Sequence, residues 1–357
     1  MIRIDIISGF LGAGKTTLIK KLLAGPLKGT QVVLIENEFG EIGIDGGFLK
    51  ETGIEIKEMN SGCICCSLVG DFGDALKEVA RKYAPERIII EPSGVGKLSD
   101  VIEAVRDSSS DEMEVNCATA VVDVTKCKMF LKNFGEFYKN QIEAAGTIVL
   151  SRTDLEKATQ EMIDEAIALI KEINDQAVIV TTPLEELDAD RLLSVMEEGR
   201  MYDGGLKLEE EHEHHHHHHD EDEEDHEHHH HHHDEDEEGH EHHHHHHDED
   251  EEGHEHHHHH HHHGHDADEV FDSIGIETAH RFTEARLAEI LNELTDEGKY
   301  GSVLRAKGIV SGENGVWYHF DMVPEQSEVR EGTADFTGRI AVIGAGIKED
   351  AVKALFA

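Results

Sequence analysis

A glycine-rich motif near the N-terminus constrains the fold of this 357-residue chain more than any other feature. Residues 9–16 read Gly-Phe-Leu-Gly-Ala-Gly-Lys-Thr and match the pattern G-x-x-x-x-G-K-[ST]. The motif follows an alternating, strand-like run at residues 2–7 and opens a helix-length segment at residues 15–24. In that position the backbone amides of the loop face phosphate groups at the N-terminus of a helix. The motif therefore predicts a nucleotide site between a strand and a helix.

Two side chains of the motif have expected roles in nucleotide chemistry. Lys15 should reach the β and γ phosphates, and the hydroxyl of Thr16 should bind magnesium. A glycine turn that binds no nucleotide is the alternative, but it would not require the lysine or the flanking strand and helix. The other residues expected to bind the nucleotide are Gly9, Gly12, Ala13, Gly14 and Thr17.

Strand-like and helix-like segments alternate up to about residue 205. This alternation predicts an α/β fold of the P-loop NTPase type, with a mainly parallel sheet covered by helices on both faces. Ligands of such sheets bind at the carboxyl ends of the strands. The expected strands span residues 2–7, 32–36, 87–91, 118–122, 147–150 and 177–180, and the expected helices span residues 15–24, 71–83, 98–106 and 155–173.

Glu91 ends one expected strand and is followed by Pro-Ser-Gly. P-loop proteins place an acidic residue at this strand end, more often aspartate than glutamate. Glu91 would either hold magnesium through a water molecule or orient the attacking water, and the sequence leaves both roles open. Gly94, three residues later, can approach the γ phosphate without a side chain in the way.

The segment Ser151-Arg152-Thr153-Asp154 stands where Asn-Lys-x-Asp usually selects the base. Asp154 retains the carboxylate that accepts two N–H donors of guanine, and Arg152 has a long stem and a flat cation that could cover a purine ring. The asparagine is replaced by Ser151. The segment favours guanine over adenine, but it does not determine how strictly guanine is selected.

Three thiols crowd into four positions, at Cys63, Cys65 and Cys66. They are too close for disulfides among themselves but suit thiolate ligation of a soft or borderline metal. Three ligands leave room for a fourth from elsewhere, which favours a transfer or sensing site. A structural metal site and redox thiols are the alternatives. Cys117 opens an apolar run and is expected to be a small core residue.

A histidine tract occupies residues 212–265 and contains 31 of the 33 histidines. Its unit is His-Glu, six histidines and five acids, repeated every 14 residues, with eight histidines in the fourth copy. Because the tract has no apolar residue up to Asp266, it is predicted to be disordered. Neutral imidazole binds zinc, nickel, copper and cobalt, so the tract is predicted to hold metal at many sites of modest affinity. A solvating linker and an expression tag are the alternatives.

Charge is concentrated in this tract. The formal net charge is −45, but residues 209–269 carry 26 acids and no Lys or Arg, and the rest of the chain is near −19. No basic face is expected, so nucleic acid is not an expected partner. Neither a signal peptide nor a membrane span is evident, and the expected compartment is the cytoplasm. The expected domains span residues 1–205, 206–269 and 270–357.

The last expected domain is a small α+β module. Residues 282–294 and 347–356 read as helices, and residues 303–310, 316–320 and 339–343 as strands. Glu313-Asn314-Gly315 is a hairpin turn signal between the first two strands. The two histidines outside the tract, His280 and His319, are expected to be packing or surface residues.

The assembled motifs resemble the CobW-like branch of the SIMIBI P-loop GTPases, the relatives of HypB and UreG. The module after the tract, with RAKG at 305–308 and WY at 317–318, also looks like the C-terminal domain of that family. The resemblance covers nearly all of the chain outside the tract. It is carried by residues 8–17 (SGFLGAGKTT), 36–41 (ENEFGE), 43–45 (GID), 62–66 (GCICC) and 91–94 (EPSG).

The resemblance implies a GTPase that uses magnesium and binds zinc, or nickel or cobalt, at the cysteine motif. It also implies a nucleotide-sensing switch at residues 36–45, in which Glu36 or Glu41 would supply the missing metal ligand or respond to the γ phosphate. The implied activity is transfer of the metal to a client metalloprotein or to a cofactor-biosynthesis enzyme, by a chain that could act as a homodimer. A metal store with a regulatory GTPase domain, and a metal-dependent regulator that acts through partner binding, are the alternative functions.

Overall fold

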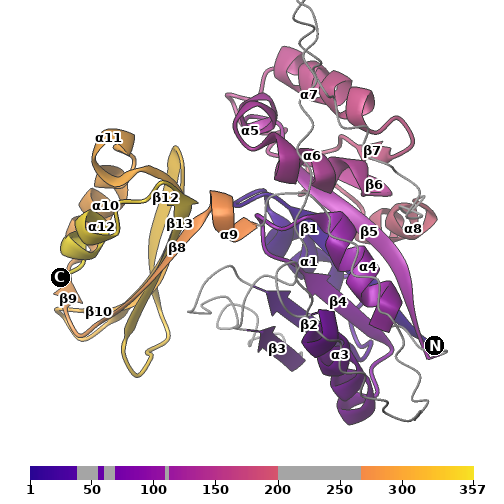
Figure 1. The fold of residues 1–357 in the computed structure, drawn as a ribbon, viewed down its shortest axis with the longest axis horizontal. Helices are drawn as coiled ribbons and strands as arrows, with labels where there is room; N and C mark the ends of the chain where they lie inside the picture. Colours follow the sequence, from indigo (N-terminus) through magenta and orange to yellow (C-terminus); the bar gives the residue numbers. More distant parts are fainter. Residues whose placement is uncertain (38–54, 60–68, 109–111, 200–266) are drawn as a thin grey trace, which may run out of the picture. The chain divides into compact units, whose positions relative to one another are not determined.

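The computed structural model describes residues 1–37, 55–59, 69–108, 112–199 and 267–357 (Figure 1). Several predicted features fall outside these ranges: Glu41 and most of the expected switch, the thiols Cys63, Cys65 and Cys66, and the histidine tract. Among the helices within the described ranges, none combines the length and the apolar character that crossing a bilayer requires.

The N-terminal part is built on a sheet of seven parallel strands in the order β3-β2-β4-β1-β5-β6-β7. The predicted parallel sheet is confirmed. Consecutive strands lie on both sides of β1, so the carboxyl end of β1 meets a point where the strand order reverses, which is where ligands bind in such sheets. The strands are β1 (Ile2–Gly9), β2 (Val32–Asn37), β3 (Glu55–Met59), β4 (Arg87–Glu91), β5 (Met113–Asp123), β6 (Thr147–Ser151) and β7 (Val178–Val180).

Helices cover both faces of this sheet, as predicted. On one face α1 and α8 pack on residues such as Ile7, Leu34 and Val149, and on the other α3 to α7 pack on residues such as Ile6, Ile35 and Ile90. The helices are α1 (Lys15–Ala24), α3 (Val69–Tyr83), α4 (Leu98–Ser108), α5 (Cys127–Asn133), α6 (Gly135–Glu143), α7 (Gln160–Ile173) and α8 (Ala189–Glu198).

One helix begins later than predicted. The periodicity indicated a start at residue 155, but α7 begins at Gln160, after Thr159 caps it by accepting a hydrogen bond from the amide of Met162 at 3.3 Å. The capping hydroxyl satisfies an amide that a helix leaves unpaired at its first turn, and so fixes the start there. Cys117 is fully buried in the core, which confirms its predicted role.

The C-terminal module contains an antiparallel sheet in the order β12-β11-β10-β13-β8, with β9 paired to one end of β10. The predicted hairpin joins β10 and β11, and Gly315 occupies its turn with a φ of 82°. The elements are α9 (Ala267–Val270), β8 (Asp272–Thr278), β9 (Arg281–Phe282), α10 (Glu284–Glu293), α11 (Glu297–Tyr300), β10 (Ser302–Gly312), β11 (Trp317–Val323), β12 (Gln326–Gly332), β13 (Gly338–Ala345) and α12 (Glu349–Leu355).

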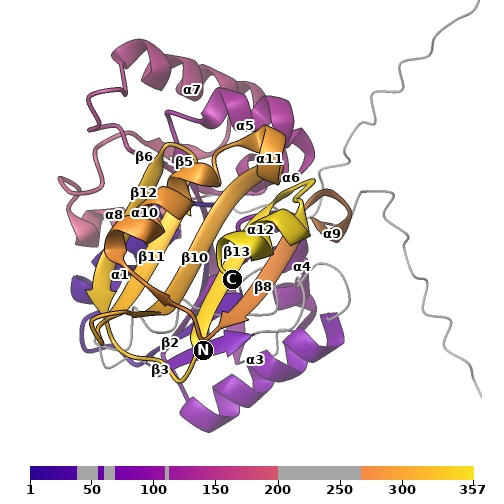
Figure 2. The ribbon, with the colours of Figure 1, turned by 90° about the vertical axis from the view of Figure 1, so that its left-hand side faces the viewer.

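Helices α10 and α12 pack on one face of the antiparallel sheet (Figure 2). Alternate residues of the strands, such as Val310, Phe320 and Val342, enter this core. His319 lies on the alternate set of positions and is nevertheless buried, with its Nε2 atom 2.9 Å from the carbonyl oxygen of Thr333. That contact matches the predicted packing role.

Candidate nucleotide site

The P-loop connects β1 to α1 in a conformation that glycine makes accessible. Gly9 and Gly14 have φ values of 144° and 107°, and a Cβ at Gly9 would lie 2.5 Å from the carbonyl oxygen of Val121 on β5. The side chain of Lys15 is buried, and its Nζ donates to the carbonyl oxygens of Gly9 at 2.8 Å and Phe10 at 3.4 Å. The loop thus holds a buried cation at the carboxyl end of β1.

One carboxylate lies beside this cation, and a second lies on the neighbouring strand. Glu91 ends β4 and Glu36 lies at the matching position of β2, so the two residues are neighbours in the parallel register. Glu91 is 8% exposed and Glu36 is 4% exposed. The Thr16 hydroxyl donates to the Glu91 carboxylate at 3.3 Å, and the Lys15 Nζ lies 4.0 Å from it. The structure therefore brings Lys15, Thr16 and Glu91 together, and it places Glu36, another predicted site residue, on the strand next to Glu91.

These oxygen atoms are suited to a hard cation. A hydroxyl and two carboxylates from three different elements are the ligand types that magnesium prefers, usually with water molecules completing the coordination. The residues present thus fit a magnesium ion at Thr16 and Glu91, with Glu36 close by.

The segment after Glu91 is held in place by the close approach of one glycine to the P-loop and by the side-chain amide of one buried glutamine. A Cβ at Gly94 would lie 2.9 Å from the backbone nitrogen of Leu11, so only glycine allows this approach to the P-loop. The Nε2 atom of Gln141, on α6, donates to the carbonyl oxygens of Gly94 at 3.0 Å and Gly96 at 2.9 Å. The sequence analysis missed Gln141, since a glutamine in a helix has no local signal for this role.

The expected base-binding loop is tied to the P-loop. The Ser151 hydroxyl donates to the carbonyl oxygen of Ala13 at 2.6 Å, so the residue that replaces the usual asparagine still links the two loops. Arg152 has a φ of 60° and contacts three partners: Asp123 at 2.9 Å, the Gly12 carbonyl oxygen at 2.9 Å, and Gln326. Its guanidinium is thus engaged beside the P-loop.

Two acidic residues, Asp154 and Asp123, lie near the expected base-binding loop. Asp154 is exposed and can present its carboxylate to a ligand. Asp123 is buried at the end of β5 and accepts hydrogen bonds from the backbone and side chain of Thr125 as well as the ion pair with Arg152. The sequence analysis ended that strand one residue too early and so missed Asp123. Its signal was the same as at Glu91, a polar residue closing an apolar run.

A cavity of about 230 Å³ lies over the P-loop. Both the N-terminal part and the C-terminal sheet contribute to its lining, which the sequence did not indicate. The lining residues are Gly12, Gly14, Lys15, Thr16, Thr17, Lys20, Glu91, Arg152, Arg305, Asp321, Val323, Gln326, Glu328 and Arg330.

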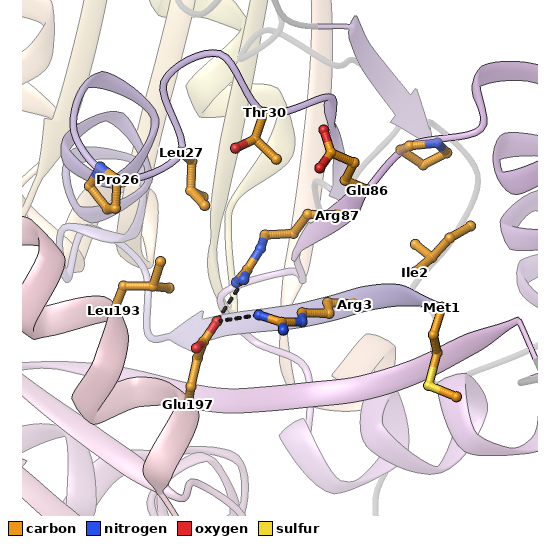
Figure 3. A pocket seen from close by; sticks show the side chains of 11 residues that line it. Met1, Ile2, Arg3, Pro26, Leu27, Thr30, Glu86, Arg87, Leu193 and Glu197 are labelled. Carbon is orange, nitrogen blue, oxygen red and sulfur yellow. Dashed lines mark hydrogen bonds and ion pairs between the residues drawn. The ribbon is translucent and has the colours of Figure 1, made fainter.

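A larger hollow, of about 610 Å³, lies at the opposite edge of the parallel sheet (Figure 3). Glu197 on α8 reaches between Arg3 and Arg87 there, with its Oε1 3.4 Å from the first and 2.6 Å from the second. Arg87 also pairs with the buried Asp5 at 2.5 Å. Because every one of these charges is paired and none is near the P-loop, we interpret the network as structural.

Within the described ranges, no group of three or more His, Cys, Asp or Glu side chains is arranged to hold a metal ion. Burial raises the pKa of the Cys127 thiol to about 11 and that of Cys117 well above its usual value. Both thiols are therefore protonated at neutral pH, and a protonated thiol is a poor metal ligand.

Two family models match this chain. The model of the CobW/HypB/UreG nucleotide-binding domain matches residues 3–181. The chain belongs to the CobW/HypB/UreG family. The model of the cobalamin synthesis protein cobW C-terminal domain matches residues 271–357, so the CobW-like resemblance of both modules is confirmed.

Two curated relatives each match less than half of the chain. The zinc chaperone CobW of Sinorhizobium sp is 36% identical over 179 residues, covering 42% of this chain and 50% of the relative. The zinc chaperone YeiR of Escherichia coli is 32% identical over 155 residues, covering 43% of this chain and 47% of the relative. The chain thus spans about half the length of these CobW-type relatives. The solved Zn(II)-bound YjiA GTPase of E. coli is similar over 99% of this chain and 98% of its own, at 18% identity and a TM-score of 0.42.

Proposed function

We propose that this chain is a GTPase metallochaperone that binds a transition metal, zinc foremost, and delivers it to a client protein. The observation that carries the proposal is the cluster of Lys15, Thr16 and Glu91 at the carboxyl ends of β1 and β4, in a chain of the CobW/HypB/UreG family. Relatives named zinc chaperones and zinc-regulated GTPase metalloprotein activators support the metal part.

In the hydrolytic step, Lys15 leaves the carbonyl oxygens of the P-loop and binds the phosphate chain. Its ammonium group binds a charged phosphate oxygen more strongly than a neutral carbonyl oxygen. Magnesium, when bound by Thr16 and Glu91, neutralises charge on the phosphates. Glu91 would either hold the ion through a water molecule or orient the attacking water. Gln141 keeps Gly94 against the P-loop, and the closed approach of that segment limits access of other water molecules.

Guanine is the base we propose. Asp154 is exposed at the end of the loop that Ser151 ties to the P-loop, and its carboxylate can accept both N–H donors of guanine. Adenine has no matching pair of donors on that edge. The contacts of Arg152 with Asp123 and Gly12 make it a residue that shapes this loop.

Metal is the cargo of the proposed cycle. The thiols Cys63, Cys65 and Cys66 would bind zinc, or nickel or cobalt, with Glu36 or Glu41 as a fourth ligand. Glu36 is adjacent to Glu91 in the sheet, and in the sequence it precedes the segment that contains the three thiols. Glu36 can therefore respond to both nucleotide and metal. Coupling requires that metal affinity differ between the GTP and GDP states, and the proposal is tested by measuring both affinities. Equal affinities would reject it.

The tract favours a second function, metal storage, because it carries 31 histidines among many acids. Deleting residues 212–265 is expected to reduce the number of zinc ions bound per chain severalfold, since most imidazole ligands are lost, and to leave basal GTP turnover nearly unchanged. Equilibrium dialysis with metal analysis measures the first and phosphate release the second. The remaining zinc should be lost on Cys65→Ser substitution. An unchanged zinc count after the deletion would contradict the storage role.

A further inference from the structure

We propose that the C-terminal sheet is part of the nucleotide site, with Arg305 of β10 and Arg330 of β12 binding the phosphate chain. This inference rests on the proposed function, because it assumes that the P-loop binds a nucleotide. Both arginines line the same cavity of about 230 Å³ as Lys15, Thr16 and Lys20. A cavity lined by the P-loop on one side and by two arginines on the other is suited to a highly charged anion.

The turn between β11 and β12 is what brings the sheet to the P-loop. A Cβ at Gly12 would lie 2.5 Å from the Cγ1 atom of Val323, so the two backbones approach closely at a position that glycine permits. The carbonyl oxygen of Pro324 accepts a hydrogen bond from the Nζ of Lys126 at 2.8 Å. Val323 and Pro324 thus hold the end of β11 beside the nucleotide loops.

One ion pair and one hydrogen bond extend this junction. Glu325 pairs with Lys157 at 2.7 Å, and Gln326 accepts a hydrogen bond from Arg152 in the expected base loop. Glu325 has a φ of 69°, a conformation that ordinary residues seldom adopt, which makes the tight turn possible. Consecutive turn residues therefore contact three cationic side chains around the P-loop. These specific polar contacts hold the turn between β11 and β12 beside the P-loop.

Arg305 and Arg330 each lie next to a carboxylate of the C-terminal sheet. The Nη2 of Arg305 lies 3.0 Å from Asp321, and the Nη1 of Arg330 lies 3.1 Å from Glu328. These carboxylates orient the guanidinium groups toward the cavity, which both acids also line. They also oppose an incoming anion, because their own charge is of the same sign. Phosphate binding should therefore tighten when Asp321 loses its charge.

The arrangement gives the C-terminal sheet a means to respond to the nucleotide. A triphosphate carries more negative charge than a diphosphate, so two arginines that face it hold the sheet more firmly before hydrolysis than after. The sheet directly follows the histidine tract in the chain. Nucleotide state would thereby act on the part of the chain that follows the histidine tract.

The test is a fluorescence titration of the full-length chain with a non-hydrolysable fluorescent GTP analogue and magnesium. Arg305→Ala and Arg330→Ala are each expected to weaken binding about 10-fold, as loss of a charge-assisted contact does. Asp321→Asn is expected to tighten binding severalfold, and Arg305→Lys to restore part of the affinity. Asp321→Asn tests the opposing charge in the cavity, and Arg305→Lys tests whether the positive charge at position 305 contributes to binding. Circular dichroism establishes that each variant is folded.

The matched control is Arg339→Ala, which removes an arginine paired with Asp335 on β13 of the same sheet but outside the cavity. It should leave affinity unchanged. Lys15→Ala separates the two proposals. If Lys15→Ala abolishes binding while Arg305→Ala and Arg330→Ala have no effect, the role of the C-terminal sheet is wrong and the P-loop site stands. If Lys15→Ala leaves binding intact, the proposed nucleotide site itself is wrong.

Discussion

Replacing Glu91 with glutamine is expected to lower the kcat of GTP hydrolysis about 100-fold or more and to change the affinity for GDP by less than about threefold. Glutamine keeps the shape of the side chain and can still accept the hydrogen bond from Thr16, which is 3.3 Å from the carboxylate. It removes the negative charge that lies 4.0 Å from the Lys15 Nζ. Both proposed roles of Glu91, holding magnesium and orienting water, need that charge.

Steady-state phosphate release and a GDP titration measure the two quantities. Glu86→Gln is a matched control, because Glu86 is an exposed residue immediately before the opposite end of β4. The control should retain wild-type turnover. A Glu91→Gln protein that hydrolyses GTP at the wild-type rate would remove Glu91 from the catalytic site, and the acidic role would then fall to Glu36, its neighbour in the sheet.

Replacing Asp5 with alanine is expected to lower the free energy of unfolding by about 3 to 5 kcal/mol, because it leaves a buried guanidinium without its closest counter-charge. Asp5 is 1% exposed, pairs with Arg87 at 2.5 Å and accepts a hydrogen bond from Asn116 at 2.7 Å. Urea denaturation measures the change. Lys128 and Glu165 form an ion pair of the same length, 2.5 Å, but both side chains are exposed. Lys128→Ala should therefore change the free energy of unfolding far less than Asp5→Ala does.

The same network gives the stability a defined pH dependence. Burial raises the pKa of Glu197, but hydrogen bonds from Arg87 and Asn116 and the nearby arginines together lower it below its ordinary value of 4.5. A carboxylate whose pKa is lower in the folded state stabilises the fold above pH 4.5, and this contribution is lost as pH falls through the folded value. Glu197→Gln should thus be less stable than wild type at pH 7, with a difference that shrinks below pH 4.5. A pH-independent difference would contradict the ionic role.

Local motifs predicted the centre of the site. Helix α1 begins and ends as expected, because a glycine-rich loop and a helix start are specified by adjacent residues. Glu91 was found because an apolar run closes on a charged residue. The adjacency of Glu36 and Glu91 was not predicted, since it depends on the register of two strands separated by more than 50 residues. That register is set by how strands order in the sheet, for which the sequence has no local signal.

The sequence did not predict that the C-terminal sheet contributes to the cavity. Strand β12 reads Gln-Ser-Glu-Val-Arg-Glu-Gly, mostly polar and at the edge of its sheet, so it lacks the apolar alternation by which strands are recognised. Arg330 therefore appeared to be an ordinary surface charge. Arg305 was noted only as part of a family-like stretch, and its place beside the P-loop depends on tertiary contacts of a turn nearly 200 residues from Lys126.

The account as a whole depends on whether nucleotide and metal binding are coupled. The direct measurement is the zinc affinity of the full-length chain, by competition with a chelating probe, with a non-hydrolysable GTP analogue bound and with GDP bound. The account predicts that zinc binds about 10-fold or more tightly in the GTP-like state, and that Cys65→Ser removes this difference while deletion of residues 212–265 does not. Equal zinc affinities in the two nucleotide states would contradict it, and a chain in which only the deletion changes zinc binding would be a metal store with a separate GTPase.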